Sequence, residues 1–146
     1  MFCIVSAVQS IHKSNAIHRN IAPESVYLSH ELALLGKMKD TVFLISQRRT
    51  RTSQVGSHLY AAPEVYQREQ HYDYKADIWS IGMTCLALSR GEMTMQPAQL
   101  STLSDEILDQ TINVTAAQQR SHSYRDFVRA CLRVNPDNRA TIDELN

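Results

Sequence analysis

The sequence has few of the residues that define fibrous, disulfide-bonded or nucleic-acid-binding proteins. Its 146 residues include only four glycines, four prolines and three cysteines. So little glycine and proline excludes a collagen-like or low-complexity disordered chain. The 15 basic residues are matched by 15 acidic ones, so the net charge gives no reason to expect nucleic acid or a membrane surface as the main partner.

The cysteines and histidines are too scattered to form a framework. Cys3, Cys85 and Cys131 lie in separate apolar stretches without a C-x-x-C pair, which indicates reduced, packed thiols in an intracellular protein. The histidines are equally dispersed, so we expect no zinc site. The N-terminus does not resemble a signal peptide, and the apolar run at residues 78–88 is too short to span a bilayer. We therefore expect a cytoplasmic protein, with the nucleus as the alternative.

The sequence does contain helical periodicity. Apolar residues recur at helical spacing in residues 2–13 and 124–132, which predicts two amphipathic helices. Residues 77–89 are apolar on nearly every side and predict a helix buried all round, which would be the central pillar of one small domain. Thr141 and Glu144 have the spacing of a capping box and predict the start of a last helix.

Strands are scarce in the predicted fold. Short β-prone runs at residues 25–28 and 32–35 predict one small hairpin, and residues 37–54 are expected to be irregular. Short helices are expected at residues 64–68 and 100–112. The sequence thus predicts a mainly α fold, a helical bundle around a buried central helix with one small β-hairpin.

Four short strings resemble motifs of protein kinases and occur in the same order. Residues 17–26, IHRNIAPESV, resemble the H-R-D-L-x-x-x-N catalytic loop. Residues 56–64 resemble the G-T-x-x-Y-x-A-P-E end of an activation segment. Residues 77–82 resemble the D-x-W-S-x-G that opens the central helix, and residues 135–141 resemble a later P-x-x-R-x-T. Each string alone is weak, but their order and spacing together are those of a kinase.

The chain therefore resembles the C-terminal lobe of a protein kinase over essentially all of residues 1–146. The resemblance implies that residues 36–64 correspond to the activation segment and that the N-lobe is absent. It also implies an ion pair between Glu64 and Arg139, and a carboxylate at Asp77 that accepts backbone N–H groups of the catalytic loop. The residues with expected structural roles are His18, Arg19, Ser57, Glu64, Asp77, Trp79, Gly82 and Arg139.

The positions that would carry catalysis depart from the kinase pattern. Phosphoryl transfer needs a group for the substrate's proton, Mg²⁺ ligands and a cation on the transferring phosphate. The resemblance puts Asn20 at the position of the base, and an amide cannot take up a proton at neutral pH. It puts Ala22 at the position of the phosphate-contacting lysine and Ser25 at that of the Mg²⁺-binding asparagine.

The D-F-G motif is missing in each register that the spacing allows. The strand pattern puts Gly36 at the aspartate position, and ungapped spacing from Ser25 puts Met38 there. A register two residues further puts Asp40 there. Only the last retains a carboxylate, and it still lacks the phenylalanine and the glycine.

These departures predict a pseudokinase, a catalytically inactive kinase-like domain that acts as an allosteric or scaffolding protein-binding module in kinase signalling. The chain looks similar to the Ste-twenty-related adaptor (STRAD) pseudokinases and to Ser/Thr kinase-like pseudokinases with an H-R-N loop. That similarity implies an active kinase, a scaffold protein or both as partners, and neither nucleic acid nor a membrane. We expect no catalytic residue, metal or cofactor in this chain, with ATP and Mg²⁺ bound only if a full-length parent retains that ability.

Two alternatives remain open at this point. One is a fragment of a divergent, weakly active ATP-dependent Ser/Thr protein kinase that uses Asp40 as a metal ligand. The other is a helical interaction domain unrelated to kinases.

Two further expectations concern the surface. Thr50 and Thr52 follow arginines in a basic segment and are candidates for phosphorylation in trans, although a solvated loop without a partner is the alternative. Apolar side chains around the hairpin and the catalytic loop, where an N-lobe would sit, should be exposed and should favour association.

Overall fold

The computed structural model describes residues 2–30, 32–44, 58–66, 72–90, 104–106 and 122–145. Its α-helices are α1 (Phe2–Lys13), α2 (Pro63–Tyr66), α3 (Lys75–Arg90) and α5 (His122–Cys131). Its strands are β1 (Ala16–Ile17), β2 (Val26–Leu28), β3 (Ala33–Leu35) and β4 (Val42–Phe43). Short 3₁₀ turns are η1 (Pro23–Ser25), η2 (Met38–Asp40), η3 (His58–Tyr60) and η5 (Pro136–Asn138).

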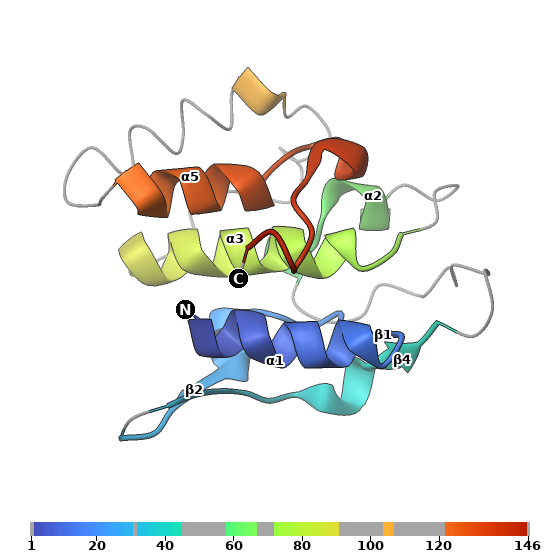
Figure 1. Ribbon diagram of the computed structural model, residues 1–146, viewed down its shortest axis with the longest axis vertical. Coiled ribbons are helices and arrows are strands. Elements are labelled where there is room, and N and C mark those ends of the chain that lie inside the picture. The colour runs from blue at the N-terminus through green and yellow to red at the C-terminus, as the bar shows by residue number, and fades with distance from the viewer. Residues whose placement is uncertain are drawn as a thin grey trace.

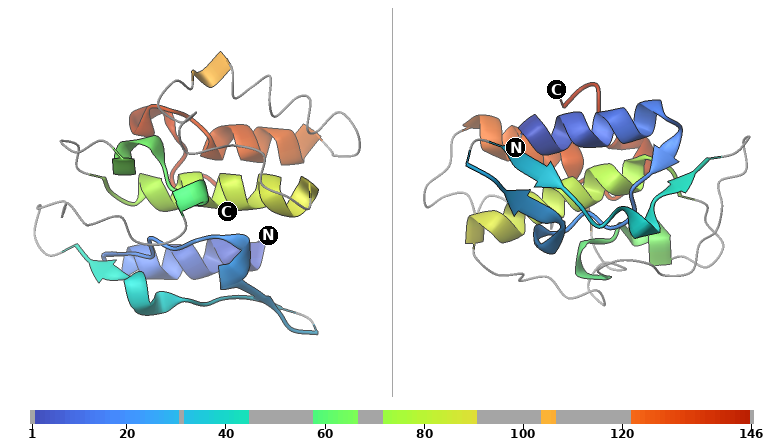
Figure 2. Two further views of the ribbon diagram at one scale, coloured as in Figure 1. Left: turned by 180° about the vertical axis from the view of Figure 1, so that it is seen from behind. Right: turned by 90° about the horizontal axis from the view of Figure 1, so that it is seen from below.

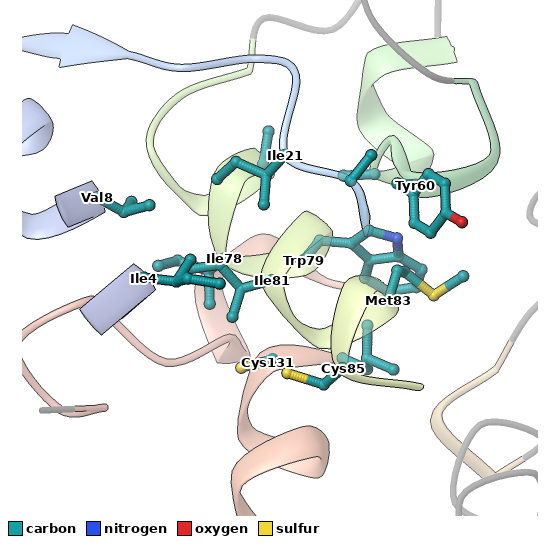
Figure 3. Packing of buried hydrophobic residues seen from close by; sticks show 14 of the residues in the cluster. Ile4, Val8, Ile21, Tyr60, Ile78, Trp79, Ile81, Met83, Cys85 and Cys131 are labelled. Atoms are coloured by element: carbon teal, nitrogen blue, oxygen red, sulfur yellow. The ribbon is translucent and has the colours of Figure 1, made fainter. Parts of the chain in front are cut away.

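Helix α3 forms the centre of the molecule, with α1 and α5 on opposite sides of it (Figure 1). Every residue from 76 to 87 is buried, so the prediction of a helix buried all round is confirmed. Trp79 and Met83 are fully buried, and Figure 3 shows them packed in a cluster that extends to Ile4 and Val8 of α1. Burying such side chains contributes about 1.5–3 kcal/mol each, which makes this helix the main source of hydrophobic stabilisation.

Gly82 lies where α3 packs tightly against the end of α5 and the residue that follows it. A Cβ atom at this position would lie 2.7 Å from Cβ of Cys131 and 2.9 Å from Cδ2 of Leu132. Real Cβ atoms do not approach other carbon atoms so closely, because dispersion attraction becomes steric repulsion well before that distance. The glycine is therefore required by the packing of the two helices.

The two flanking helices are amphipathic, as their periodicity predicts. Helix α1 buries Ile4, Val5 and Val8 while its intervening residues are exposed or half-buried. Helix α5 buries Val128 and ends at Cys131, before the proline at position 136. Both predictions of residues 2–13 and 124–132 as helices are confirmed within one or two residues.

The strands form two small antiparallel sheets rather than one. Strands β2 and β3 make the predicted hairpin, which projects away from the helices (Figures 1 and 2). Strands β1 and β4 make a second pair, with Ala16 opposite Phe43 and Ile17 opposite Val42. The prediction of one hairpin followed by irregular chain was therefore wrong for residues 38–43. Strands of two residues carry no alternation that a sequence pattern can reveal.

The remaining predicted elements have mixed outcomes. Helix α2 begins at Pro63, and the expected segments 67–68 and 100–103 lie outside the described residues, as do 107–112. Thr141 and Glu144 make the capping-box contacts, but the residues after Thr141 form a turn instead of a helix. Cys3 is exposed, so the expectation that all thiols are packed was wrong for this one. None of the described helices has the length and apolar character needed to cross a membrane.

Candidate functional site

Asp77 connects the central helix to the loop that resembles a kinase catalytic loop. Its side chain is buried in the first turn of α3, where a carboxylate is favoured by the positive end of the helix dipole. Its Oδ2 accepts the backbone N–H of His18 at 2.8 Å, and its Oδ1 accepts that of Arg19 at 2.9 Å. Nε2 of His12 lies 2.9 Å from the same Oδ2. The main chain of the loop is thus fixed to the core by one carboxylate.

The ring of His18 joins the loop to the chain that follows the hairpin. Its Nε2 lies 2.9 Å from the carbonyl oxygen of Gly36, and its Nδ1 lies 3.2 Å from the backbone nitrogen of Asn20. Because a carbonyl only accepts and an N–H only donates, the Nε2–H tautomer satisfies both contacts together. The fully buried ring therefore orients the loop.

Arg19 adopts a strained backbone conformation inside this loop. Its φ is 66°, in the left-handed region, which costs a residue other than glycine about 1–2 kcal/mol. The backbone bond to Asp77 and a 2.6 Å bond from Arg19 Nε to the carbonyl oxygen of Asp40 hold it there. Strain of this kind persists only where the surroundings determine the conformation.

The amide of Asn20 is bonded to the carboxylate of Asp40. Asn20 Nδ2 donates to Asp40 Oδ2 at 2.7 Å, and the two residues are only 9% and 8% exposed. A hydrogen bond to a charged acceptor in such a buried place is stronger than a neutral one. The side chain at the position of the base is therefore engaged as a donor, and it occupies one oxygen of the nearest carboxylate.

The hydroxyl of Ser25 closes a local turn. Ser25 Oγ donates to the carbonyl oxygen of Ala22 at 2.7 Å and accepts the backbone N–H of Ala22 at 2.9 Å. Both residues are almost fully buried, and Ala22 brings no cation to the loop. The two positions together shape the turn into η1.

The three candidate positions for the D-F-G aspartate lie in different surroundings. Gly36 directly follows β3 and donates its N–H to the carbonyl oxygen of Ser25 at 2.8 Å, as the strand-based register assumes. Met38 is 46% exposed. Asp40 is buried against Asn20, so among these positions it alone presents a carboxylate to the loop. Strand β3 therefore ends directly before Gly36, as the first register assumes. The carboxylate that contacts the loop is that of Asp40, the aspartate position of the third register.

The residues around the loop fit a kinase-type Mg²⁺ site poorly. Within the described part of the chain, no three His, Cys, Asp or Glu side chains come close enough to hold a metal ion. The carboxylate of Asp40 already accepts from Asn20, and the hydroxyl of Ser25 is used twice by Ala22. Hard cations such as Mg²⁺ require several oxygen ligands in octahedral geometry.

The expected ion pair between Glu64 and Arg139 is present. Arg139 Nη1 lies 2.6 Å from Glu64 Oε1 and Nη2 lies 3.1 Å from Oε2, a bidentate arrangement. Arg139 also donates to the carbonyl oxygen of Lys75 at 2.7 Å, and its guanidinium lies over the Trp79 ring, 5.1 Å from the centroid. Both charges are buried, so each depends on the other for compensation.

Two further polar residues, which the sequence did not single out, contact α3 or the chain before α2. His12, at the end of α1, contacts Asp77, and Ser80 Oγ donates to the carbonyl oxygen of Tyr60 at 2.9 Å. A cavity of about 20 Å³ beside Ser80, Asn20 and Asp77 has room for about one water molecule. Ser80 belongs to the D-x-W-S-x-G string, but the side-chain bond could not be foreseen from the string itself.

The buried thiols are not candidates for catalysis. Burial raises the pKa of Cys85 to about 12, and burial raises the pKa of Cys131 well above its usual value. A thiol with such a pKa is protonated at neutral pH and is a poor nucleophile. Ser57, Thr50 and Thr52 lie outside the described residues.

Sequence comparison agrees with the order of the motifs. The model of the protein kinase domain family matches residues 1–146, and the chain belongs to this family.

Its relatives include serine/threonine-protein kinases of fungi. The chain is 32% identical to the serine/threonine-protein kinase pakA of Talaromyces marneffei over 97% of its own length. It is 31% identical to CLA4 of Candida albicans over 99% and 32% identical to MST20 of Pyricularia oryzae over 94%. It spans only 22% of the length of pakA and 15% of the length of the other two.

Proposed function

We propose that this chain is the C-terminal-lobe portion of a catalytically inactive kinase domain, a pseudokinase, which acts by binding another protein in kinase signalling. The observation that carries the proposal is the 2.7 Å bond from Asn20 Nδ2 to Asp40 Oδ2. An amide replaces the proton acceptor, and the same amide occupies the carboxylate that a metal would need.

The expected loss of rate is large. A positioned general base typically contributes about 10²- to 10⁴-fold, and metal-borne charge stabilisation contributes several kcal/mol more. The positions act as one unit, so these penalties do not simply add. Ala22 and the closed turn at Ser25 remove the remaining cation and ligand of the loop, which supports an inactive domain.

Exposed apolar side chains on and after the hairpin support the protein-binding part of the proposal. We call this set of side chains the hairpin patch. It consists of Tyr27, Leu28, Leu32, Leu34 and Met38, with Tyr27 opposite Leu34 on one face of the hairpin and Leu28 on the other face. Leu28 is 85% exposed, which is unusual for a leucine in a strand. Grouped apolar side chains of this kind often mark interaction sites, and the resemblance favours an active kinase or a scaffold protein as the partner.

A second function is favoured by one observation. Asp40 is a buried carboxylate that lies beside the catalytic loop and is bonded to the side chain of Asn20. The alternative is therefore a portion of a divergent, weakly active ATP-dependent Ser/Thr protein kinase.

Phosphate transfer separates the two functions. The longest natural polypeptide that carries this segment should be purified and incubated with radiolabelled ATP, Mg²⁺ and a general protein substrate. We expect no transfer above that of a heat-treated sample, and no change in Asp40→Ala. The matched control is Asp126→Ala, at an exposed carboxylate on α5. Transfer that Asp40→Ala abolishes and Asp126→Ala preserves would overturn the proposal in favour of the alternative.

Partner binding can be tested through the hairpin patch. We expect the double variant Leu28→Ser/Leu34→Ser to lose capture of its kinase or scaffold partner while its circular dichroism and melting temperature stay close to those of the wild type. Leu88→Ser is the matched control, since this leucine is 51% exposed but lies on α3 and not on the hairpin. Equal capture by all three proteins would exclude the hairpin patch as the binding surface.

A further inference from the structure

A cavity of about 260 Å³ lies away from the catalytic loop, where three segments meet. The segments are the end of α1, the start of α3 and the turn that follows Arg139, and Figure 1 shows the C-terminal segment running across α3 toward α1. A hydrogen bond of 2.7 Å from Gln9 Nε2 to Asp143 Oδ1 ties the two sides together. Drug-sized sites measure roughly 300–1,000 Å³, so this cavity suits a somewhat smaller ligand.

The floor and one wall of the cavity are apolar. Ile78 and Ile142 line it and are almost fully buried. Tyr74 forms a wall with His12, and the centroids of their rings lie 5.0 Å apart. An aliphatic or aromatic group would bury apolar surface against these side chains, which is the usual basis of affinity for small ligands.

The other charged side chains around the cavity are hydrogen-bonded to neutral groups, which hold them in place without removing their charge. Asp73 accepts the backbone N–H of Lys75 at 2.9 Å, and the ammonium of Lys75 donates to the carbonyl oxygen of Arg139. Asp143 accepts from Gln9, as described above.

Lys13 differs from these residues. It lines the same cavity at the end of α1, and within the described part of the chain its ammonium contacts no acceptor. His12, the residue before it, is engaged with Asp77. The cavity therefore offers an apolar surface to a ligand, together with the ammonium group of Lys13.

We propose that this cavity binds a small organic anion with an apolar body, such as a carboxylic acid, whose charge pairs with Lys13. The inference does not depend on whether the chain transfers phosphate, because it uses none of the catalytic-loop positions. Bound ligand contacts the ring of His12, which lies 2.9 Å from Asp77 Oδ2, and that oxygen also accepts the backbone N–H of His18. Binding of a ligand in the cavity should therefore change the environment of the His18 and Arg19 amides in the catalytic loop.

The test uses the whole chain and two probes that differ only in charge. 3-Phenylpropionate and 3-phenylpropan-1-ol are titrated into ¹⁵N-labelled protein, and affinities are taken from amide chemical shifts. We expect the acid to bind about two- to fivefold more tightly than the alcohol, the size of one exposed charge contact. Lys13→Met should remove this preference and Lys13→Arg should retain it. The matched control is Lys39→Met, at an exposed lysine of η2, which should leave the preference unchanged.

The amides of His18 and Arg19 provide the second readout. Their resonances should shift with the same saturation curve as residues that line the cavity, since both donate to Asp77. Three results would overturn the proposal: no binding of either probe at millimolar concentration, equal affinity for acid and alcohol, or the same effect from Lys39→Met as from Lys13→Met. Saturable binding without shifts at His18 and Arg19 would overturn the link to the loop.

Discussion

Two buried polar pairs lie close to the start of α3, and they differ in their charge and in the parts of the chain that they join. Arg139 and Glu64 are opposite charges 75 positions apart, joined by two hydrogen bonds. Asn20 and Asp40 are a neutral amide and a carboxylate 20 positions apart, joined by one hydrogen bond of 2.7 Å. The first pair fastens the C-terminal region to α2, and the second occupies the groups that a kinase would use for chemistry.

The Glu64–Arg139 pair belongs to the residues that hold the fold, whereas the Asn20–Asp40 pair lies at the loop that resembles a catalytic loop. The structural anchor, by which we mean Glu64, Asp77, Trp79 and Arg139, is buried and fully connected to distant parts of the chain. The side chains of Asn20 and Ser25 make bonds of similar length, but these bonds close on Asp40 or on the loop itself. Measurements that disturb one region at a time should show whether this division is real.

The largest effect is expected from the anchor. Arg139→Met leaves the carboxylate of Glu64 buried without its partner, so the free energy of unfolding should fall by about 3–5 kcal/mol. Urea denaturation monitored by Trp79 fluorescence measures this directly. Asp126→Asn is the control, because that carboxylate is 65% exposed and lies 3.9 Å from Arg129, where such a pair contributes less than about 1 kcal/mol. Equal losses in the two variants would contradict the role of the anchor.

The next effect tests the packing of α3 on α5. Gly82→Ala forces a methyl group against Cys131 and Leu132, so the free energy of unfolding should fall by about 1–3 kcal/mol in spite of alanine's better helix propensity. Leu88→Ala, at a half-exposed position of the same helix, should change it by no more than about 0.5 kcal/mol. A stabilised Gly82→Ala protein would mean that the two helices are free to separate.

A smaller effect is expected from the loop, and it should depend on pH. Asn20→Asp puts a second carboxylate beside Asp40, and like charges at this distance raise the pKa of the pair. A raise of one pKa unit corresponds to about 1.4 kcal/mol, so stability at pH 7 should fall by about 1–2 kcal/mol. The folded pKa then lies above the unfolded value, so the deficit grows as pH rises through the folded pKa and disappears below the unfolded one.

Denaturation at several pH values, with and without Mg²⁺, measures this response. Asn20→Ser, which adds no charge, is the control and should show no such pH dependence. Recovery of stability in Asn20→Asp on addition of Mg²⁺ would indicate that the loop can still assemble a metal site. A pH-independent Asn20→Asp variant would show that Asp40 is not close to this side chain in solution.

The smallest effect lies at the capping-box turn, outside both regions. The backbone N–H and the hydroxyl of Thr141 donate to Glu144 and lower the pKa of this fully exposed carboxyl. Because the folded pKa lies below the unfolded one, its contribution is present at neutral pH and is lost as pH falls through the folded value. Thr141→Val removes both bonds of the hydroxyl but keeps the bond from the backbone N–H of Thr141 to the carboxylate, so NMR titration should give a pKa between that of the wild type and the usual value. Thr141→Ser should match the wild type.

The helices could be predicted because they carry periodic apolar residues. The sequence also contains several strings that resemble kinase motifs. That resemblance predicted the buried ion pair of Glu64 with Arg139 and the role of Asp77. The β1–β4 pair could not be foreseen, since it depends on a turn in which Lys37 has a φ of 57°. Lysine does not mark left-handed backbone in a sequence as glycine or asparagine would.

The contact between Asn20 and Asp40 was missed for the same reason. The sequence left three registers open for the D-F-G position, and the turn at Lys37 decides which side chain meets the loop. The cavity beside Lys13 was also beyond prediction, because its walls come from three segments that only tertiary packing brings together.

One consequence follows from how Asp77 holds the loop. Both of its bonds to the loop go to backbone N–H groups, which every residue except proline possesses. Mutations at positions such as 20 and 22 therefore change what the loop displays without loosening its attachment. Side chains at these positions can therefore be exchanged one at a time while the loop stays bonded to α3. For the same reason, reactive side chains introduced at these positions by mutation would be attached to a main chain that Asp77 already holds in place.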